Sequence, residues 1–136
     1  MKKITLFCLG SLVTLCLAGT ARADVPADKA GSGPEAKALT FAADIKPIFD
    51  RSCVRCHAPG KAKANLVLDS LNGVLRGSED GKVVRPGDSN GSKLVQNITG
   101  AGRAKVMPPP RNKANIGPLT KDQIALIRTW IDQGAK

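Results

Sequence analysis

Hydrophobic positions recur at helical spacing in several short stretches of the chain, and the clearest stretch lies near the C-terminus. Ile124, Ile127 and Ile131 fall on one face, and Leu126 and Trp130 widen that face. Polar residues occupy the positions between them. This spacing predicts an amphipathic helix of about three turns.

The sequence also marks both ends of this C-terminal helix. Thr120 is a candidate N-cap, and Gln123 follows three residues later, as a capping box requires. Leu119 and Ile124 are placed for a hydrophobic staple. Gly134 stands where the end of a helix favours a positive φ.

A second helix is expected near residue 45. Ile45, Ile48 and Phe49 share one face at helical spacing. Asp44 is placed to cap this helix, with Pro47 in its first turn, where a missing N–H group costs little.

Two shorter helices and an extended segment complete the pattern. Residues 71–75 predict one or two helical turns that end at Gly77, and residues 92–98 predict a helix that ends at Gly100. Residues 107–110 (MPPP) are expected to be extended, because three consecutive prolines cannot lie inside a helix. With no long strand pattern and no internal repeat, the chain is expected to be all-α, with short helices and long loops.

The first residues have the pattern of an exported protein. Lys2 and Lys3 precede an apolar run over residues 4–17, and small residues at Ala21 and Ala23 mark a cleavage site. We therefore predict a signal peptide over residues 1–23. A membrane anchor is the alternative, but the run is shorter than the ~20 residues that a bilayer requires, and no membrane span is expected after cleavage.

Cleavage reduces the residues that are available for chemistry. The mature chain keeps two cysteines, one histidine and one methionine: Cys53, Cys56, His57 and Met107. Residues 24–39 are rich in Ala, Gly, Pro and charge, and predict a flexible leader. Residues 40–136 then form one small domain that is short of core residues, so a bound group is expected to fill its centre.

The chain is basic, with a formal net charge of +10. Such a field favours docking to acidic partners, although a solvated cationic surface is the plain alternative. Nucleic acid is not expected as a partner, because the lysines are scattered and no aromatic platform lies among them.

The stretch RSCVRCHAPG contains a Cys-X-X-Cys-His motif with several chemical interpretations. A disulfide oxidoreductase would place the pair after a buried strand, and no strand pattern precedes Cys53. A closed zinc site would need a fourth ligand from a carboxylate. A structural disulfide would close a very small loop and leave His57 unexplained. Covalent haem uses all three residues, because two thiols attach the porphyrin and the next histidine binds the iron.

Met107 is the remaining strong candidate for a second axial ligand. It precedes three prolines, which stiffen the loop that would hold a weakly bound thioether. The alternatives are an ordinary core methionine, a lysine ligand or an open iron site.

Several motifs in order along residues 41–136 resemble a monohaem class I cytochrome c, and most closely the planctomycete-type cytochrome c domain. The segments that carry the resemblance are DIKPIF at 44–49, CVRCH at 53–57, LVLDS at 66–70, RPGD at 85–88, SKL at 92–94, MPP at 107–109, and LT at 119–120 running to WIDQGA at 130–135. The family implies an all-α fold around one haem c, attached at Cys53 and Cys56, with His57 as proximal and Met107 as distal ligand.

The chain departs from the family in two ways. Ala58 stands where the family often has glycine, which puts only the local turn in doubt. Such domains are also often fused to larger proteins, so the partner of this chain is open.

The expected function is electron transfer in the periplasm between a redox donor and a redox acceptor, after loading by the haem-maturation machinery. A His/Met-ligated iron has no place for substrate, so no enzymatic activity is expected; the alternative is a five-coordinate haem protein acting as a peroxidase-like enzyme or gas sensor. Phe49 and Trp130 are expected to pack the terminal helices together and against the porphyrin edge. Arg85, Arg103 and Lys105 are candidates for pairing with haem propionates.

Overall fold

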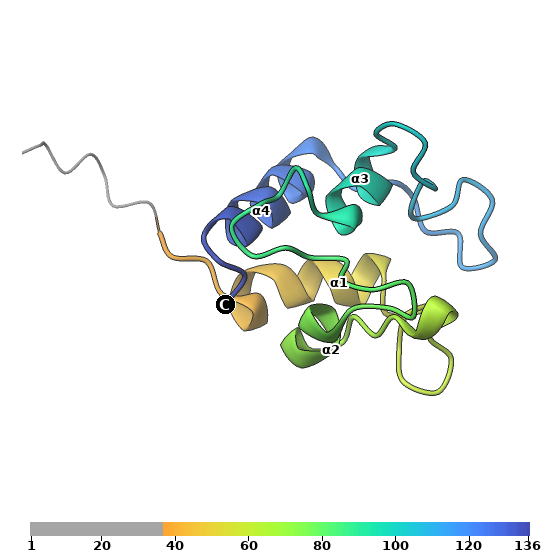
Figure 1. Cartoon of the computed structure of the whole chain (residues 1–136). Helices are drawn as coiled ribbons and strands as arrows, with labels where there is room; N and C mark the ends of the chain where they lie inside the picture. The colour runs from red at the N-terminus through yellow and green to blue at the C-terminus, as the bar shows by residue number, and fades with distance from the viewer. Residues whose placement is uncertain (1–36) are drawn as a thin grey trace, which may run out of the picture. The chain divides into compact units, whose positions relative to one another are not determined.

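The computed structural model describes residues 37–136, so the predicted signal peptide and most of the predicted leader lie outside the described residues. Within this range the chain forms helices and no β-strand, apart from an isolated bridge between Ser78 and Gly81 (Figure 1). The all-α prediction is confirmed. In chain order the elements are the π-helical turn η1 (Phe41–Ile45), α1 (Lys46–Ser52), the 3₁₀ turn η2 (Lys63–Asn65), α2 (Leu71–Arg76), α3 (Lys93–Thr99) and α4 (Lys121–Asp132).

The first helix begins earlier than its sequence pattern predicts. Its N-cap is Thr40, whose hydroxyl accepts a hydrogen bond from the Ala43 N–H at 3.3 Å. Asp44 is therefore not the cap; its carboxylate accepts from the Thr40 N–H at 2.9 Å and from Lys37 Nζ at 2.7 Å. The Thr40 side chain thus accepts from a backbone N–H inside the first turn, and the Asp44 side chain accepts from the N–H of the cap residue. This reciprocal pattern resembles a capping box with one extra residue.

Pro47 is the second residue of α1 (Lys46–Ser52), and this helix follows the π-helical turn η1 directly. The turn before it is wider than an α-turn, because the Lys46 N–H bonds to the carbonyl of Phe41, five residues back. A wider turn relieves the clash between a proline ring and the carbonyl four residues before it. The prediction that Pro47 lies in the first turn is thus confirmed for α1, although the π-helical turn η1 precedes that helix.

The C-terminal helix agrees with its sequence signals. The Thr120 hydroxyl accepts from the Gln123 N–H at 3.2 Å, and Gln123 Oε1 accepts from the Thr120 N–H at 2.9 Å, so the capping box is confirmed. Gly134 has a φ of +98°, the positive value expected for it. α2 and α3 also form where predicted, and each is followed by a glycine with positive φ, Gly77 and Gly100.

Aromatic rings join the two ends of the domain. The Phe41 ring lies 6.0 Å from Phe49 in an edge-on arrangement and 5.9 Å from Trp130. Phe49, Trp130, Ile127 and Ile131 are completely buried. The predicted packing of the first helix against α4 is therefore confirmed, and Phe41 is the ring that connects them.

Hydrogen bonds reinforce this junction, where the C-terminus lies beside the start of the first helix (Figure 1). The Lys136 carbonyl accepts from the Phe41 N–H and from Trp130 Nε1, both at 2.9 Å. The Gln133 amide bonds to the Leu39 N–H and to the Lys37 carbonyl. Lys37 and Leu39, which belong to the predicted leader, thus contact the end of the domain. None of the helices in residues 37–136 has the length and apolar character to cross a bilayer.

We expect Asp44→Asn to destabilise the domain at neutral pH and to have little effect in acid. The Lys37 ammonium and then the Thr40 N–H hold the pKa of Asp44 below its usual value of 3.8. A carboxylate with a lowered folded-state pKa stabilises the fold above its unfolded pKa, and this stabilisation is lost as the pH falls through the folded pKa. Urea unfolding of the haem-loaded protein at neutral pH and well below pH 3.8 measures the difference, because urea does not screen the Lys37–Asp44 pair.

The matched control for this prediction is Asp50→Asn. Asp50 pairs with Lys46 at 2.8 Å, but both side chains of this pair are 41–46% exposed, so the pair should contribute little. An Asp44→Asn variant that is no less stable than Asp50→Asn at neutral pH would contradict the role of Asp44 at the helix start.

Candidate functional site: a thiol, imidazole and thioether pocket

The end of α1 delivers the Cys-X-X-Cys-His motif in a series of tight turns. The N–H groups of Cys53 and Val54 both bond to the Phe49 carbonyl, at 2.8 and 2.9 Å. The N–H groups of Cys56 and His57 then both bond to the Cys53 carbonyl at 3.0 Å. The two thiols are free and line one pocket. The motif is therefore fixed by its own backbone and by the helix before it.

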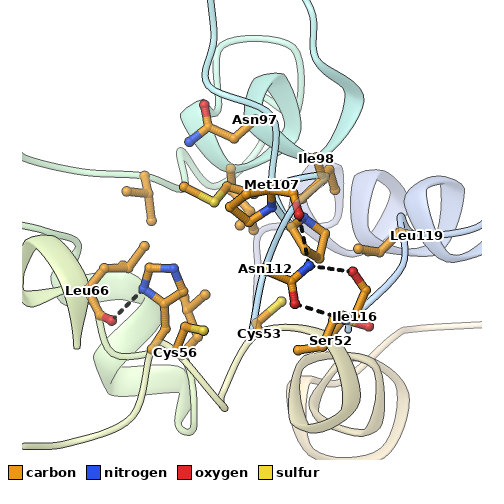
Figure 2. A pocket seen from close by; sticks show the side chains of 16 residues that line it. Ser52, Cys53, Cys56, Leu66, Asn97, Ile98, Met107, Asn112, Ile116 and Leu119 are labelled. Atoms are coloured by element: carbon orange, nitrogen blue, oxygen red, sulfur yellow. Dashed lines mark hydrogen bonds between the residues drawn. The ribbon is translucent and has the colours of Figure 1, made fainter. Parts of the chain in front are cut away.

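The His57 ring is held by the backbone of the segment that follows. Its Nδ1 lies 3.2 Å from the Leu66 carbonyl, drawn as a dashed line in Figure 2. A carbonyl can only accept, so Nδ1 carries the proton in this bond and Nε2 keeps its lone pair. Metal-binding histidines commonly hold their other nitrogen in this way.

Burial favours the neutral form of this imidazole. Desolvation lowers the pKa of His57, and although the hydrogen bond to Leu66 opposes the shift, the net direction is downward. A neutral ring with Nε2 unprotonated is the form that binds iron.

Burial also decides the state of Cys53. Desolvation, and to a smaller degree the nearby Cys56, raises the pKa of the Cys53 thiol to about 12. The reactive cysteine of a disulfide oxidoreductase has a lowered pKa, which makes it a thiolate at neutral pH. The environment of Cys53 has the opposite character, so it gives no support to the oxidoreductase interpretation.

Met107 reaches the pocket from the long loop between α3 and α4. Its N–H bonds to the Asn97 carbonyl of α3 at 3.0 Å, and its side chain lines the same pocket as the thiols and His57. In Figure 2 it enters from the side opposite Cys56. The chain bends at Met107, Pro108 and Pro110, so the expectation of an extended MPPP segment is wrong. The Met107–Pro108 peptide bond is cis.

All four predicted site residues line this one pocket, whose remaining wall is mainly apolar. It encloses about 630 Å³ of empty space, part of which is open to solvent. The lining residues are Ser52, Cys53, Cys56, His57, Leu66, Leu68, Val83, Leu94, Asn97, Ile98, Met107, Pro108, Pro109, Asn112, Ile116 and Leu119. Two thiols and an imidazole are the groups that attach and ligate haem c, and a thioether is a second axial ligand found in cytochromes c.

Other residues that were expected beside the haem do not line the pocket. Phe49 and Trp130 do not line it, because they are used to join the two ends of the domain. Arg85, Arg103 and Lys105 do not line it either. A zinc site would need a cluster of at least three His, Cys, Asp or Glu side chains, and none is arranged to hold a metal ion among residues 37–136.

Sequence reasoning missed two parts of the site. The first is the Leu66 carbonyl. Every residue has a backbone carbonyl, so the sequence does not indicate which one bonds to His57. The second is Asn112, whose side chain bonds to the loop that carries Met107. An asparagine among prolines and glycines signals only a turn, so its three partners could not be found without the structure.

Comparison with known proteins tests the resemblance. Residues 53–111 match the family model of planctomycete cytochrome C. The resemblance predicted from the sequence is confirmed over this segment, which begins at Cys53 and includes both Cys56–His57 and Met107. A cytochrome c domain carries covalently bound haem, and with the fit of the pocket this indicates a haem c protein.

A search of curated proteins gives no match. Among solved structures, Kuenenia stuttgartiensis hydrazine synthase matches with 25% identity and a TM-score of 0.46. The match covers 71% of this chain and 16% of the hydrazine synthase chain. The planctomycete cytochrome C match therefore carries the argument about the family.

We expect the double substitution Cys53→Ala/Cys56→Ala to abolish covalent haem. Each thiol forms one thioether, so no bond remains to hold haem after the chain unfolds. In denaturing gels stained for haem, the wild type should stain and the double variant should not. Ser52→Ala is the control, because Ser52 lines the same pocket without a thiol. Staining of the double variant would show that the cysteines do not attach the haem.

Proposed function

We propose that this chain is a periplasmic cytochrome that carries single electrons through one haem c with His57 and Met107 as axial ligands. The observation that carries the proposal is the pocket, where the two thiols, His57 and Met107 meet. Haem bound there supplies an iron that changes between two oxidation states, and a methionine ligand raises its reduction potential. The family match supports the haem, and the placement of the four side chains supports their roles.

The chain's own residues make this pocket suited to a carrier. Cys53 and Cys56 would hold the porphyrin, and His57 is oriented by the Leu66 carbonyl so that Nε2 is the nitrogen left for the iron. Leu68, Val83 and the other apolar lining residues exclude water. With Met107 as second ligand, no iron position is left for a substrate, which supports a carrier over an enzyme or gas sensor.

The cellular location follows from the same proposal. Cytochromes of this kind receive haem outside the cytoplasm, and the N-terminal residues 1–23 have the pattern of a cleaved signal peptide. We therefore place the domain of residues 40–136 in the periplasm, with a leader over residues 24–39.

We expect Met107→Ala to open the iron to carbon monoxide and to lower the reduction potential. The reduced wild type should not respond to carbon monoxide, and the oxidised wild type should show the weak red absorption band of a sulfur-ligated iron. The variant should bind carbon monoxide and lose that band. Absorption spectra and a redox titration measure both effects.

Val106→Ala is the neighbouring control, because Val106 is 43% exposed and does not line the pocket. It should behave as the wild type does. An unchanged spectrum in Met107→Ala would remove Met107 as a ligand, and the five-coordinate enzyme or sensor would become the better account.

Positive charge is concentrated in two segments of the described residues, and this concentration supports an acidic redox partner. Residues 51–68 and 89–121 supply all but one of the pocket-lining residues, and neither segment contains an Asp or Glu. They contain ten cations: Arg51, Arg55, Lys61, Lys63, Lys93, Arg103, Lys105, Arg111, Lys113 and Lys121. The rest of residues 37–136 has seven cations and eight carboxylates. The net positive charge of the described residues thus lies in the two segments that supply the pocket wall, although none of the ten cations lines the pocket itself.

Four of these cations meet beside Cys56. Arg55, Lys63, Arg111 and Lys113 line a cleft to which Cys56 also contributes, so this cleft adjoins the haem pocket. All four side chains are exposed. The ion pairs within residues 37–136 involve Lys37 and Lys46 near the first helix, so the cleft cations have no acidic partner within that part of the chain.

We expect Lys63→Glu/Arg111→Glu to slow oxidation of the reduced protein by hexacyanoferrate(III). Attraction between the cleft and this trianion should be replaced by repulsion, so the rate should fall by about tenfold or more at low salt and converge with the wild type at high salt. Stopped-flow absorption measures the rate. Arg76→Glu/Lys82→Glu is the control matched in charge, because both cations are exposed and lie outside the two acid-free segments. An equal effect in the control would mean that only net charge matters.

A further inference from the structure

The loop that brings Met107 into the pocket has little regular hydrogen bonding. It joins α3 to α4, and four of its residues are prolines, which have no backbone N–H to donate. The backbone of residues 107–119 makes two bonds of its own, from the Met107 N–H to the Asn97 carbonyl and from the Asn115 N–H to the Asn112 carbonyl. Something else must hold this loop in one shape.

The Asn112 side chain supplies three further bonds. Its Nδ2 donates to the carbonyls of Pro109 and Ile116, each at 2.8 Å, and its Oδ1 accepts from the Ile116 N–H at 2.9 Å. Both amide hydrogens and the amide oxygen are thus used. Figure 2 shows these dashed lines beside Met107 and Ile116.

We propose that Asn112 is a positioning residue that keeps Met107 in the pocket. It ties Pro109, two residues after Met107, to Ile116 on the returning arm of the loop. Asn112, Met107 and Pro109 line the same pocket, and Asn112 is half-buried there. The proposal rests on Met107 acting as an axial ligand.

The three hydrogen bonds of the Asn112 side chain require an amide group. Two of the three partners are carbonyl oxygens, which need donors, and the third is an N–H group, which needs an acceptor. Aspartate has the same size but no donor, and its carboxylate would repel the carbonyls of Pro109 and Ile116. Alanine removes all three bonds. Both changes should leave Cys53, Cys56 and His57 undisturbed, because those residues are held by α1 and by Leu66.

The test compares haem-loaded Asn112→Ala and Asn112→Asp with the wild type. Both variants should keep covalent haem but lose part of the red sulfur-to-iron band when oxidised. When reduced, they should bind carbon monoxide at least ~10-fold faster than the wild type, since each lost hydrogen bond favours the open loop several-fold. Hydrogen exchange at the Ile116 amide should accelerate in parallel.

Asn72→Ala controls for replacing an exposed asparagine, on α2, and should match the wild type. Asn112→Asp separates hydrogen bonding from volume: wild-type behaviour of this isosteric variant would overturn the proposal. If Met107→Ala fails to admit carbon monoxide, the ligation itself is wrong. If it succeeds and both Asn112 variants resist carbon monoxide, only the positioning role is wrong.

A measurement on the wild type covers the case in which neither variant accumulates. On warming, the red sulfur-to-iron band and the protection of the Ile116 amide from hydrogen exchange should be lost together. The reason is that the Asn112 hydrogen bonds maintain both. Loss of the band while Ile116 stays protected would overturn the proposal.

Discussion

The packing of Phe41 between Phe49 and Trp130 is the contact on which the rest of the structure depends. These rings join the first helix to α4, and the Lys136 carbonyl closes the junction through the Phe41 N–H and Trp130 Nε1. With the two ends of the domain fixed, the chain between them is free to be irregular. Most of the pocket wall comes from these irregular stretches, and α3 adds Leu94, Asn97 and Ile98.

The two sides of the pocket are stabilised in different ways. The side with Cys53, Cys56 and His57 continues directly from α1 and is fixed by bonds between near neighbours in the sequence. The Met107 side is a long loop held by one backbone bond to α3 and by the Asn112 amide. Local unfolding should therefore begin on the Met107 side. This asymmetry suits a permanently attached group that needs one strong and one weaker ligand.

What could be predicted from the sequence follows the same division. Thr120, Gln123 and Gly134 act over a few residues, so their local signals were sufficient to define α4. The Cys-X-X-Cys-His motif is equally local. The start of the first helix was misjudged because a π-helical turn before Pro47 moves the cap from Asp44 to Thr40. Asn112 and the Leu66 carbonyl were missed because their roles depend on partners that only the folded loops bring close. Met107 was predicted by elimination, since no other methionine remains once the predicted signal peptide is removed.

The uneven distribution of charge also affects encounters between identical molecules. Two copies of the proposed electron carrier that meet through the cation-lined clefts beside Cys56 bring together surfaces of the same sign, and the repulsion between these surfaces opposes contact. Electron self-exchange should therefore be slow at low ionic strength. A population of such molecules then keeps its oxidised and reduced members distinct until each meets a partner of opposite charge.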